Sequence, residues 1–457
     1  MFANCYGVVN VKGDEIGMGY FDFASLSTAN YMFSKYGCSG QLGVRASLPP
    51  SVTSAKGIWN QSQVRYIDAA NTASMCSNFY KAAYNCDSLV EAKIKFGTEC
   101  DCSYMFSHCS NNYLAIYLEN SNKIKNAEGM FYESYLNILK TIEDGREIEG
   151  RVDFSNVTNA YLMFARTGHL SLPYDNEARY LWMASNANMT YMFTGSTIIS
   201  DIHIDAHDIL NAQGMFADAS VINSKIKIVG IGDGQFGGGA DCTRMFYNFK
   251  ASDDSLSSID VNLRWVKSAD SMFKSAAVKN INSCRPHDGC FLYLESASSM
   301  FESSYISAYD VESLFEDTYL HKSVYIGSDI HLSRMFANCL SLDRIPISHS
   351  FFDSLVFKHT NNRTYRTDCS EMFSNCSNMR CSWDWSNTDC TFRGEYVSGM
   401  FEYSGIESVV DIPMQTDCAD SMFYYCGYLT DFSCSYSLVR TGYSMFEGCH
   451  RLSSFRT

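Results

Sequence analysis

The dipeptide Met-Phe occurs fifteen times in this chain and uses fifteen of its 21 methionines. Most gaps between successive copies are about 22 to 37 residues, a spacing typical of solenoid repeats. The chain is therefore predicted to be an array of small units, and its function has to be sought on the surfaces that an array presents. The copies begin at Met1, Met32, Met105, Met130, Met163, Met192, Met215, Met245, Met272, Met300, Met335, Met372, Met400, Met422 and Met445.

The residues that follow Met-Phe come in two versions. In one, a cysteine stands four residues after the Met and an apolar residue seven after it. In the other, a small residue replaces the cysteine and the apolar residue moves one place earlier, as in Met192 with Ser196 and Ile198. The fourth position therefore requires a small buried group. The residues predicted to form the repeat core are Met335, Phe336, Cys339, Leu342, Met372, Phe373, Cys376, Met422, Phe423, Cys426, Met445, Phe446 and Cys449.

Beyond this core, several units alternate apolar and polar residues with the two-residue period of a strand, as in Ile202 with Ile204 and Ile226 with Ile228. Each unit is expected to be a short helix or turn that carries Met-Phe, then a tight bend and a short strand. No unit has enough apolar surface for its own core, so stacking must bury Met, Phe and the inward strand residues together. The predicted fold is a leucine-rich-repeat-like solenoid of short parallel strands with one continuous core.

Two segments carry a family resemblance, Asp153 to Phe164 and Met372 to Met379. Their pattern resembles BspA-like leucine-rich-repeat surface proteins, in particular the Met-Phe-centred variant of mycoplasma-type and gut-bacterial proteins. The resemblance covers nearly the whole chain as a pattern. The chain departs from it at 46–100, where only a degenerate unit at 82–89 is recognisable, and at 229–241, a glycine-rich insertion. The resemblance implies a cell-surface or secreted protein with a role in adhesion.

The repeats predict a single array over 1–457, of roughly sixteen units. Solenoids usually need atypical units at their ends. This chain opens directly on Met1 to Cys5, and only eleven residues follow Phe446. We therefore expect the chain to belong to a longer product, or a neighbouring domain or subunit to cover its ends.

The formal net charge of −15 argues against a nucleic-acid partner, because phosphate binding usually needs a basic patch. The same charge disfavours anionic membrane surfaces, and no apolar run is long enough for a spanning helix, so membrane insertion is not expected. The chain has no nucleophile elbow, phosphate loop or HExxH sequence, and we expect no cofactor.

Nineteen cysteines suggest a disulfide framework at first, but the repeat argues otherwise. Six of them stand where other units have a small residue: Cys5, Cys109, Cys339, Cys376, Cys426 and Cys449. A cysteine that alternates with serine is expected to be a small buried thiol. Most cysteines are therefore predicted to be free, although neighbouring units could form occasional bridges in an oxidising compartment.

The best candidate for a metal site is the strand-like segment with Asp201, His203, Asp205 and His207. On a strand these residues share the outer side, while Ile202 and Ile204 point inward. Histidine and carboxylate side chains suit zinc or a similar ion, but a solvated polar strand face is the favoured interpretation. The residue types from Gly232 to Gly237 match the dinucleotide-binding motif, but the long helix that this motif requires does not follow. A loop is therefore predicted there.

Aromatic residues are the other candidates for binding. The chain has thirty tyrosines, and tyrosines on an exposed strand face make good contacts with proteins or carbohydrates. Trp383 and Trp385 stand at alternate positions, so on a strand they would point the same way, most simply into the core.

These patterns favour a non-enzymatic binding or adhesion scaffold that contacts a protein or glycan through its outer strand face or its variable loops. The chief alternative is a structural protein of a phage virion, such as a fibre, spike or decoration. A metal-dependent enzyme with its site at 201–208 is a third interpretation, from a different functional class.

Overall fold

The computed structural model describes residues 26–35, 51–69, 75–143, 146–148, 151–171, 180–231, 239–252, 258–278, 281–283, 294–315, 330–354 and 367–456. They form a parallel β-solenoid with almost no helix, which confirms the predicted fold class. The chain divides into two compact units, residues 1–230 and 231–457. A single array over the whole chain stays a prediction.

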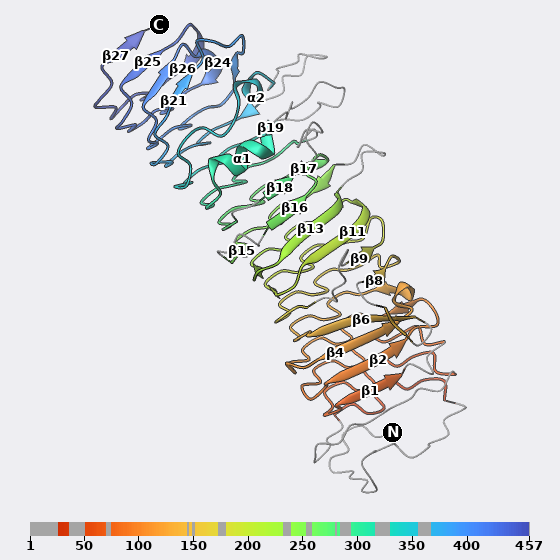
Figure 1. The fold of residues 1–457 in the computed structure, drawn as a ribbon. Helices are drawn as coiled ribbons and strands as arrows, with labels where there is room; N and C mark the ends of the chain where they lie inside the picture. Colours follow the sequence, from red (N-terminus) through yellow and green to blue (C-terminus); the bar gives the residue numbers. More distant parts are fainter. Residues whose placement is uncertain are drawn as a thin grey trace, which may run out of the picture. The chain divides into compact units, whose positions relative to one another are not determined.

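In the first unit the longer strands stack in two parallel groups (Figure 1). The first group has the order β1-β2-β4-β6, and β7 adds to β6 in antiparallel fashion. The second group has the order β8-β9-β11-β13, and two-residue strands pair as β3-β5 and β10-β12 on another side of the repeats. The bounds are β1 Tyr66–Ala69, β2 Glu91–Lys95, β3 Cys100–Asp101, β4 Ala115–Glu119, β5 Ile124–Asn126, β6 Ile138–Glu143, β7 Arg146–Ile148, β8 Arg151–Phe154, β9 Tyr180–Met183, β10 Thr197–Ile198, β11 Ile202–Ile209, β12 Ser220–Val221 and β13 Lys225–Ile231, with a 3-10 turn η1 at Ser121–Lys123.

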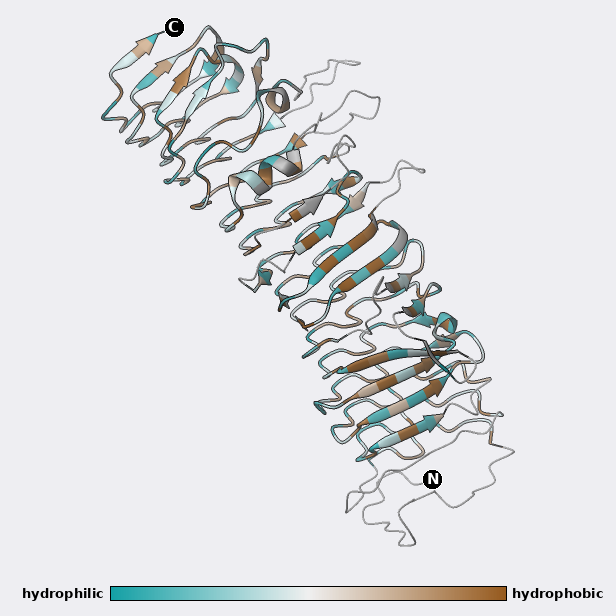
Figure 2. Cartoon of the chain, in the orientation of Figure 1, coloured by the Kyte–Doolittle hydropathy of each residue, from teal (hydrophilic) through white to brown (hydrophobic). Residues whose placement is uncertain are grey.

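The second unit repeats this plan with the parallel groups β16-β18, β14-β17, β19-β20, β21-β23-β25-β27 and β22-β24-β26. Its strands are β14 Ala240–Asp241, β15 Lys250–Ala251, β16 Ser258–Val261, β17 Val266–Ser268, β18 Ile281–Ser283, β19 Ile330–His331, β20 Thr367–Asp368, β21 Ser382–Asp384, β22 Phe392–Arg393, β23 Ser408–Val410, β24 Pro413–Cys418, β25 Asp431–Ser433, β26 Tyr436–Thr441 and β27 Ser454–Arg456. The two short helices are α1 Ala308–Phe315 and α2 His349–Ser354. Along the strands, buried and half-buried residues alternate, as β2 and β24 show. Figure 2 shows the matching alternation of hydrophobic and hydrophilic residues along several of the longer strands.

Each described Met-Phe lies in a turn rather than in a helix. We call the segment from two residues before the Met to four residues after it the Met-Phe turn, and count positions from the Met. In every described Met-Phe turn, the residues at −1 and +3 have positive φ, as Gly129 (53°) and Glu133 (53°) do around Met130. Residues in this left-handed conformation interrupt a right-handed helix, so the chain bends twice around Met-Phe.

Hydrogen bonding explains why such turns stack. Around Met130, the backbone N–H groups at −1, +1 and +3 donate to carbonyls of the next repeat, at 2.8, 2.8 and 3.0 Å. The alternate N–H groups, of Met130, Tyr132 and Ser134, donate to carbonyls of their own turn. Half of the backbone donors in a turn therefore need a neighbouring repeat, and an isolated turn would leave them unsatisfied.

The core of each unit contains a column of phenylalanine rings. In the first unit, Phe106, Phe131, Phe164, Phe193 and Phe216 stack with centroid separations of 5.8, 5.2, 5.2 and 4.9 Å and nearly parallel planes. In the second unit the column runs through Phe246, Phe273, Phe301, Phe336, Phe373, Phe401, Phe423 and Phe446. Because stacked repeats place equivalent side chains directly over one another, the array buries large rings that a single repeat would expose.

The predicted core residues lie as follows. Met335, Phe336, Cys339, Leu342, Met372, Phe373, Cys376, Met422, Phe423 and Cys426 are all buried. Met445, Phe446 and Cys449, in the last repeat of the sequence, are half-buried. Trp383 and Trp385 are 3% and 2% exposed, which confirms that they point into the core.

Residues 46–100 contain more repeats than the Met-Phe pattern reveals. Ala82-Ala83 occupies a Met-Phe turn, and so does Ile58-Trp59, which the sequence pattern missed. Gly57 and Gln61, on either side of Ile58-Trp59, have the positive φ that marks such turns. Apolar residues of other shapes therefore satisfy the same backbone, because Trp59 is buried just as each Phe is.

The predicted glycine-rich insertion is narrower than 229–241. Its first residues belong to β13 and its last to β14, and 232–238, including the fingerprint-like Gly232 to Gly237, lie outside the described residues. Met1 to Cys5 also lie outside them.

Candidate functional site

The outward side of the Met-Phe turns is the most regular surface of the molecule. In the turn around Met105, the side chains of Met105, Phe106 and Cys109 are buried, whereas Tyr104 at −1 and His108 at +3 are half-buried. In this turn Ser103 at −2 and Ser107 at +2 are small and buried, so −1 and +3 are the positions most open to variation. Their backbone conformation repeats from turn to turn.

An asparagine or aspartate at −4 helps to define these positions. Its side-chain oxygen accepts a hydrogen bond from the backbone N–H at −2, as in Asn78 with Tyr80 (3.0 Å) and Asp101 with Ser103 (2.9 Å). The other residues that do this are Asn126, Asn159, Asn188, Asn211, Asp241 and Asp368. This is an Asx turn, and it satisfies a donor at the entry of each Met-Phe turn.

Three repeats with serine or threonine at −4 satisfy the same donor differently. In these repeats the backbone N–H at −2 donates to the side chain of an asparagine or aspartate at −2 of the preceding repeat. Asn30 accepts from Lys56, Asp270 from Ser298 and Asp420 from Tyr443, at 3.0, 2.8 and 2.8 Å. The donor is thus satisfied in both cases, which indicates that its pairing is a requirement of the turn.

Several tyrosines lie flat across the next repeat because a glycine makes room for them. A Cβ atom at Gly57, Gly129 or Gly214 would lie only 2.4, 2.5 or 2.2 Å from a ring carbon of Tyr31, Tyr104 or Tyr191, respectively. All six residues occupy position −1 of their turns. Each glycine therefore both adopts the positive φ and holds the ring of the preceding repeat against the backbone, with the other ring face outward.

Five residues at the turn positions of the first unit lie close together, and we call them the tyrosine–lysine cluster: Lys56, Tyr80, Lys81, Tyr84 and Tyr104. The Lys81 Nζ atom lies 5.3, 4.8 and 5.8 Å from the ring centroids of Tyr80, Tyr84 and Tyr104. The Lys56 Nζ atom lies 4.9 Å from the centroid of Tyr80, and the rings of Tyr80 and Tyr104 are 6.5 Å apart. Two ammonium groups therefore share three half-exposed aromatic rings by cation–π contact.

An aromatic and charged row continues this surface along the first unit. The His108 ring lies 5.2 Å from Tyr84 and 5.6 Å from Tyr132, and its Nδ1 atom is 3.1 Å from Glu133. Burial raises the pKa of Glu133, but hydrogen bonds from Arg166 and Tyr132 outweigh it and leave that pKa below its usual value. Glu133 is therefore charged at neutral pH and is engaged within the row.

A hydroxyl at the edge of the cluster is also engaged. The Tyr104 hydroxyl donates a hydrogen bond of 2.8 Å to Glu128. Burial and this bond raise the pKa of Tyr104 to about 12. The Tyr104 ring is therefore oriented by its hydroxyl at one end and by Gly129 beneath it.

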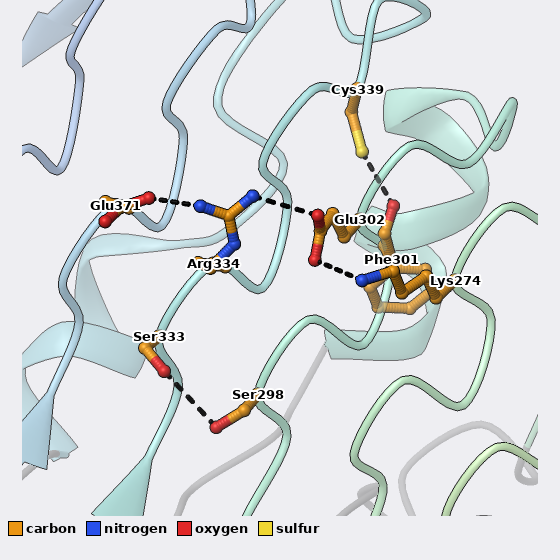
Figure 3. A network of polar contacts seen from close by, with 8 residues as sticks. All are labelled: Lys274, Ser298, Phe301, Glu302, Ser333, Arg334, Cys339 and Glu371. Carbon is orange, nitrogen blue, oxygen red and sulfur yellow. Dashed lines mark hydrogen bonds and ion pairs between the residues drawn. The ribbon is translucent and has the colours of Figure 1, made fainter.

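In the second unit, the same turn positions carry an ion-pair row, which we define as Lys274, Glu302, Arg334 and Glu371 (Figure 3). Glu302 accepts from Lys274 and Arg334, each at 2.9 Å, and Arg334 also pairs with Glu371. Burial raises the pKa of Glu302, but hydrogen bonds from Arg334, Lys274 and Ser299 outweigh it and lower that pKa to about 2. The charges of this row satisfy one another.

A second aromatic group lies farther along the second unit. The rings of Tyr403, Tyr424 and Tyr425 lie 4.6 to 5.8 Å from one another. The negative charges of Glu402 and Glu447 lie close enough to contribute to a raised pKa of Tyr424, whose largest cause is burial. This group therefore combines tyrosines with carboxylates rather than with lysines.

Of the predicted metal candidates, His203, Asp205 and His207 lie on β11 and Asp201 directly precedes it. Ile202 and Ile204 are buried, and Asp201, His203 and Asp205 are half-buried, so the predicted facing of the segment is correct where side chains are described. Nothing is described of the His207 side chain. Asp201 accepts a hydrogen bond from the backbone of Lys225 at 2.9 Å. Over the described ranges, no group of three or more His, Cys, Asp or Glu side chains is placed to hold a metal ion.

The cysteines at +4 have a structural role. The thiol of Cys109 donates to the carbonyl of Ala83 in the preceding repeat (3.1 Å), and that of Cys339 to the carbonyl of Phe301 (2.8 Å). Serine is shorter, and Ser134 donates instead to Phe131 of its own turn, at 2.7 Å. The cysteines in the described part of the chain are free thiols, as predicted, and burial raises the pKa of Cys339 to about 11. Such thiols are poor nucleophiles.

Comparisons with known proteins add no family. No family model matches the chain, and no curated protein and no solved structure matches it. Among the helices of the described residues, none is both long and apolar enough to cross a membrane.

Proposed function

We propose that this protein is a non-enzymatic binding scaffold, and that the outer side of the Met-Phe turns in its first unit contacts a protein or glycan partner. The observation that carries the proposal is the tyrosine–lysine cluster, in which half-buried rings from two successive repeats contact two lysine ammonium groups and the Tyr104 ring lies over Gly129. Aromatic side chains that are already ordered make strong contacts, because little conformational entropy is lost when a partner binds.

The composition of this surface supports the same function. Positions −2, −1, +2 and +3 of the turns are rich in tyrosine, serine, glycine and asparagine, for example Tyr80, Asn85, Ser103 and Gly129. These four residue types also dominate antibody binding loops, where tyrosine supplies contact area and the small polar residues supply adaptable hydrogen bonds. In the Ala82-Ala83 turn all four positions are half-buried rather than buried, so the side chains of Tyr80, Lys81, Tyr84 and Asn85 are accessible to a partner.

The strand face of the same unit is a weaker candidate. On β2 and β4 the outward residues pair with one another: Lys95 with Glu119 at 2.6 Å, and Lys93 with Glu91 at 3.3 Å. Paired charges of this kind are typical of a solvated surface. By its resemblance to BspA-like surface proteins, we propose a cell-surface or secreted setting for the scaffold.

The test is an array of immobilised proteins and glycans probed with the full chain and with two double variants. Tyr80→Ala/Tyr84→Ala removes two outward rings of the cluster. Lys93→Ala/Tyr117→Ala is the matched control, because it removes a lysine and a tyrosine from the strand face of the same unit. We expect the cluster variant to lose at least tenfold in affinity for the selected ligand and the control to bind normally. Equal binding by all three proteins would refute the assignment of this surface.

A further inference from the structure

We propose that the tyrosine–lysine cluster binds an acidic polysaccharide, with uronic-acid carboxylates on Lys56 and Lys81 and sugar rings on the tyrosines. This inference rests on the proposed function and names the class of ligand for the same surface.

The first argument is that these lysines are unpaired. In the part of the chain that the structure describes, no carboxylate forms an ion pair with Lys56 or Lys81. Other lysines of the molecule do form such pairs, for example Lys267 with Glu295 and Lys274 with Glu302. The net charge of −15 repels polyanions from most of the surface, but two lysines without carboxylate partners attract an anionic ligand locally.

The second argument is the aromatic setting of the two ammonium groups. Both are half-buried among ring faces, and cation–π contact replaces only part of their hydration. A carboxylate that bound there would form a charge-assisted hydrogen bond in a partly desolvated site, which is stronger than the same bond in open water. The tyrosine faces beside it are apolar in the middle and polar at the hydroxyl, as a sugar ring requires of its platform.

The third argument is the repeat itself. Lys56, Lys81 and Tyr104 come from three successive repeats, and each occupies position −2 or −1 of its turn. A ligand that lies across the turns therefore meets a lysine in the first two of these repeats and tyrosine rings in the last two. A polysaccharide with a carboxylate and a ring in each sugar suits both kinds of group, whereas an acidic peptide supplies the charge without the flat ring. The structure thus favours the polysaccharide over the peptide.

The second aromatic group makes the assignment specific to the first unit. Tyr403, Tyr424 and Tyr425 offer similar rings, but Glu402 and Glu447 contribute negative charge there. The tyrosine–lysine cluster also has a carboxylate, because Glu128 accepts from the Tyr104 hydroxyl, but two lysines lie over its rings. Among the described residues no lysine lies over the rings of the second group, so we expect it to bind a uronic-acid polymer more weakly.

The experiment measures the affinity of the full chain for polygalacturonate by titration calorimetry, with neutral dextran and poly-glutamate as comparison polymers. We expect binding of polygalacturonate that weakens as salt is raised, at least tenfold weaker binding of poly-glutamate, and no binding of dextran. Lys81→Gln and Lys56→Gln should each lower the affinity for polygalacturonate about tenfold. Lys274→Gln, which removes a paired lysine from the second unit, should change it less than twofold.

Tyrosine variants separate stacking from charge. Tyr84→Ala should lower the affinity for polygalacturonate about tenfold, and Tyr84→Phe, which keeps the ring and the fold, should lower it less than threefold. Equal affinity for polygalacturonate and poly-glutamate would mean that the surface recognises negative charge and not the sugar ring. That result would overturn the inference.

Failure of the inference is distinguishable from failure of the proposed function. If polygalacturonate does not bind, or binds unchanged to Lys56→Gln/Lys81→Gln, the inference is wrong. The proposed function would still stand in that case if Tyr80→Ala/Tyr84→Ala abolished binding to a different array ligand.

Discussion

The tyrosine–lysine cluster of the first unit and the ion-pair row of the second unit use the same positions of the same turn in different ways. At −1 the first unit has Lys81 and Tyr104, and the second has Arg334 and Glu371. All four residues have φ between 53° and 58°, so their backbones are nearly identical. Arg334 pairs with Glu302 and Glu371, whereas Lys81 lies over the rings of three tyrosines.

This difference teaches that the fold does not determine the outer residues. The buried Phe column and the hydrogen bonds between repeats are the same in both units, so they define the turn. The outer residues are then of two kinds. Those that pair with one another stabilise the unit, and those that are unpaired contribute little to stability and are available to a partner. Substitutions at core, glycine and ion-pair positions measure these contributions separately in the two units.

The largest expected effect comes from the part that the two units share. Phe131→Ala in the first unit and Phe301→Ala in the second should each destabilise the protein by about 3–5 kcal/mol, because each ring is fully buried between two others. Urea unfolding followed by circular dichroism measures both. Tyr132→Ala, one residue farther along the turn and half-buried, is the control and should cost far less. A loss in only one unit would show that the two cores are not equivalent.

The next effect tests the glycine that holds a ring of the first unit. Gly129→Ala should cost about 1–3 kcal/mol, because the new methyl group would lie 2.5 Å from Tyr104 and alanine disfavours the positive φ. Ser271→Ala at the same position in the second unit replaces a residue that already adopts positive φ, so it should be nearly neutral.

A double variant isolates the contribution of the ring. In Tyr104→Ala/Gly129→Ala the clash is absent, and the total loss should be smaller than the sum of the two single losses. Strict additivity would mean that Tyr104 does not lie over Gly129.

The ion-pair row should give an effect similar in size to that of Gly129→Ala. Glu302→Gln should cost about 1–3 kcal/mol at pH 7, because Lys274 and Arg334 lose a shared and largely buried carboxylate. The folded-state pKa of Glu302, about 2, lies below the usual pKa of about 4.3, so the carboxylate stabilises the fold above that usual value. The stability difference from wild type should shrink as the pH falls from about 4.5 towards 2.

The matched control for that series is Glu312→Gln, which breaks an exposed pair with Arg344 and should change stability by less than about 1 kcal/mol. A difference between wild type and Glu302→Gln that stays constant from pH 7 to pH 2 would contradict the pairing of Glu302.

The sequence predicts the inside of this molecule better than its outside. Met, Phe and the small residue at +4 recur in the amino-acid sequence. Burial of Cys339 follows from its place in the repeat, and burial of Trp383 and Trp385 follows from their alternate positions. The Met-Phe pattern missed the repeat at Ile58-Trp59 because core packing requires apolar side chains of suitable volume and not particular residue types. The positive φ at −1 was missed for a similar reason, since residues as different as Tyr31, Leu162 and Arg334 adopt it under the constraint of stacked repeats.

The sequence left the binding surface open between the outer strand face and the variable loops, and we propose the turns. A signal for the turns exists in the sequence, because Asn126, Asn159 and Asn188 recur four residues before Met and are typical of Asx turns. Their regular occurrence, together with tyrosine at −2, −1 and +2, indicates an ordered and variable surface. Which rings and charges meet across repeats depends on the register of stacking, which spacing along one chain does not contain.

The most direct test of the account is a hydrogen-exchange footprint of the full chain with and without polygalacturonate, or with the polymer that the array selects. The account predicts that the ligand slows exchange in peptides covering 56–61, 80–85 and 103–109. It predicts no change in the matched turns at 270–275, 298–303 and 333–338, or in β2 and β4. Protection of the strands or of the second unit's turns, with none at 80–85, would contradict the claim that the first unit's Met-Phe turns form the binding surface.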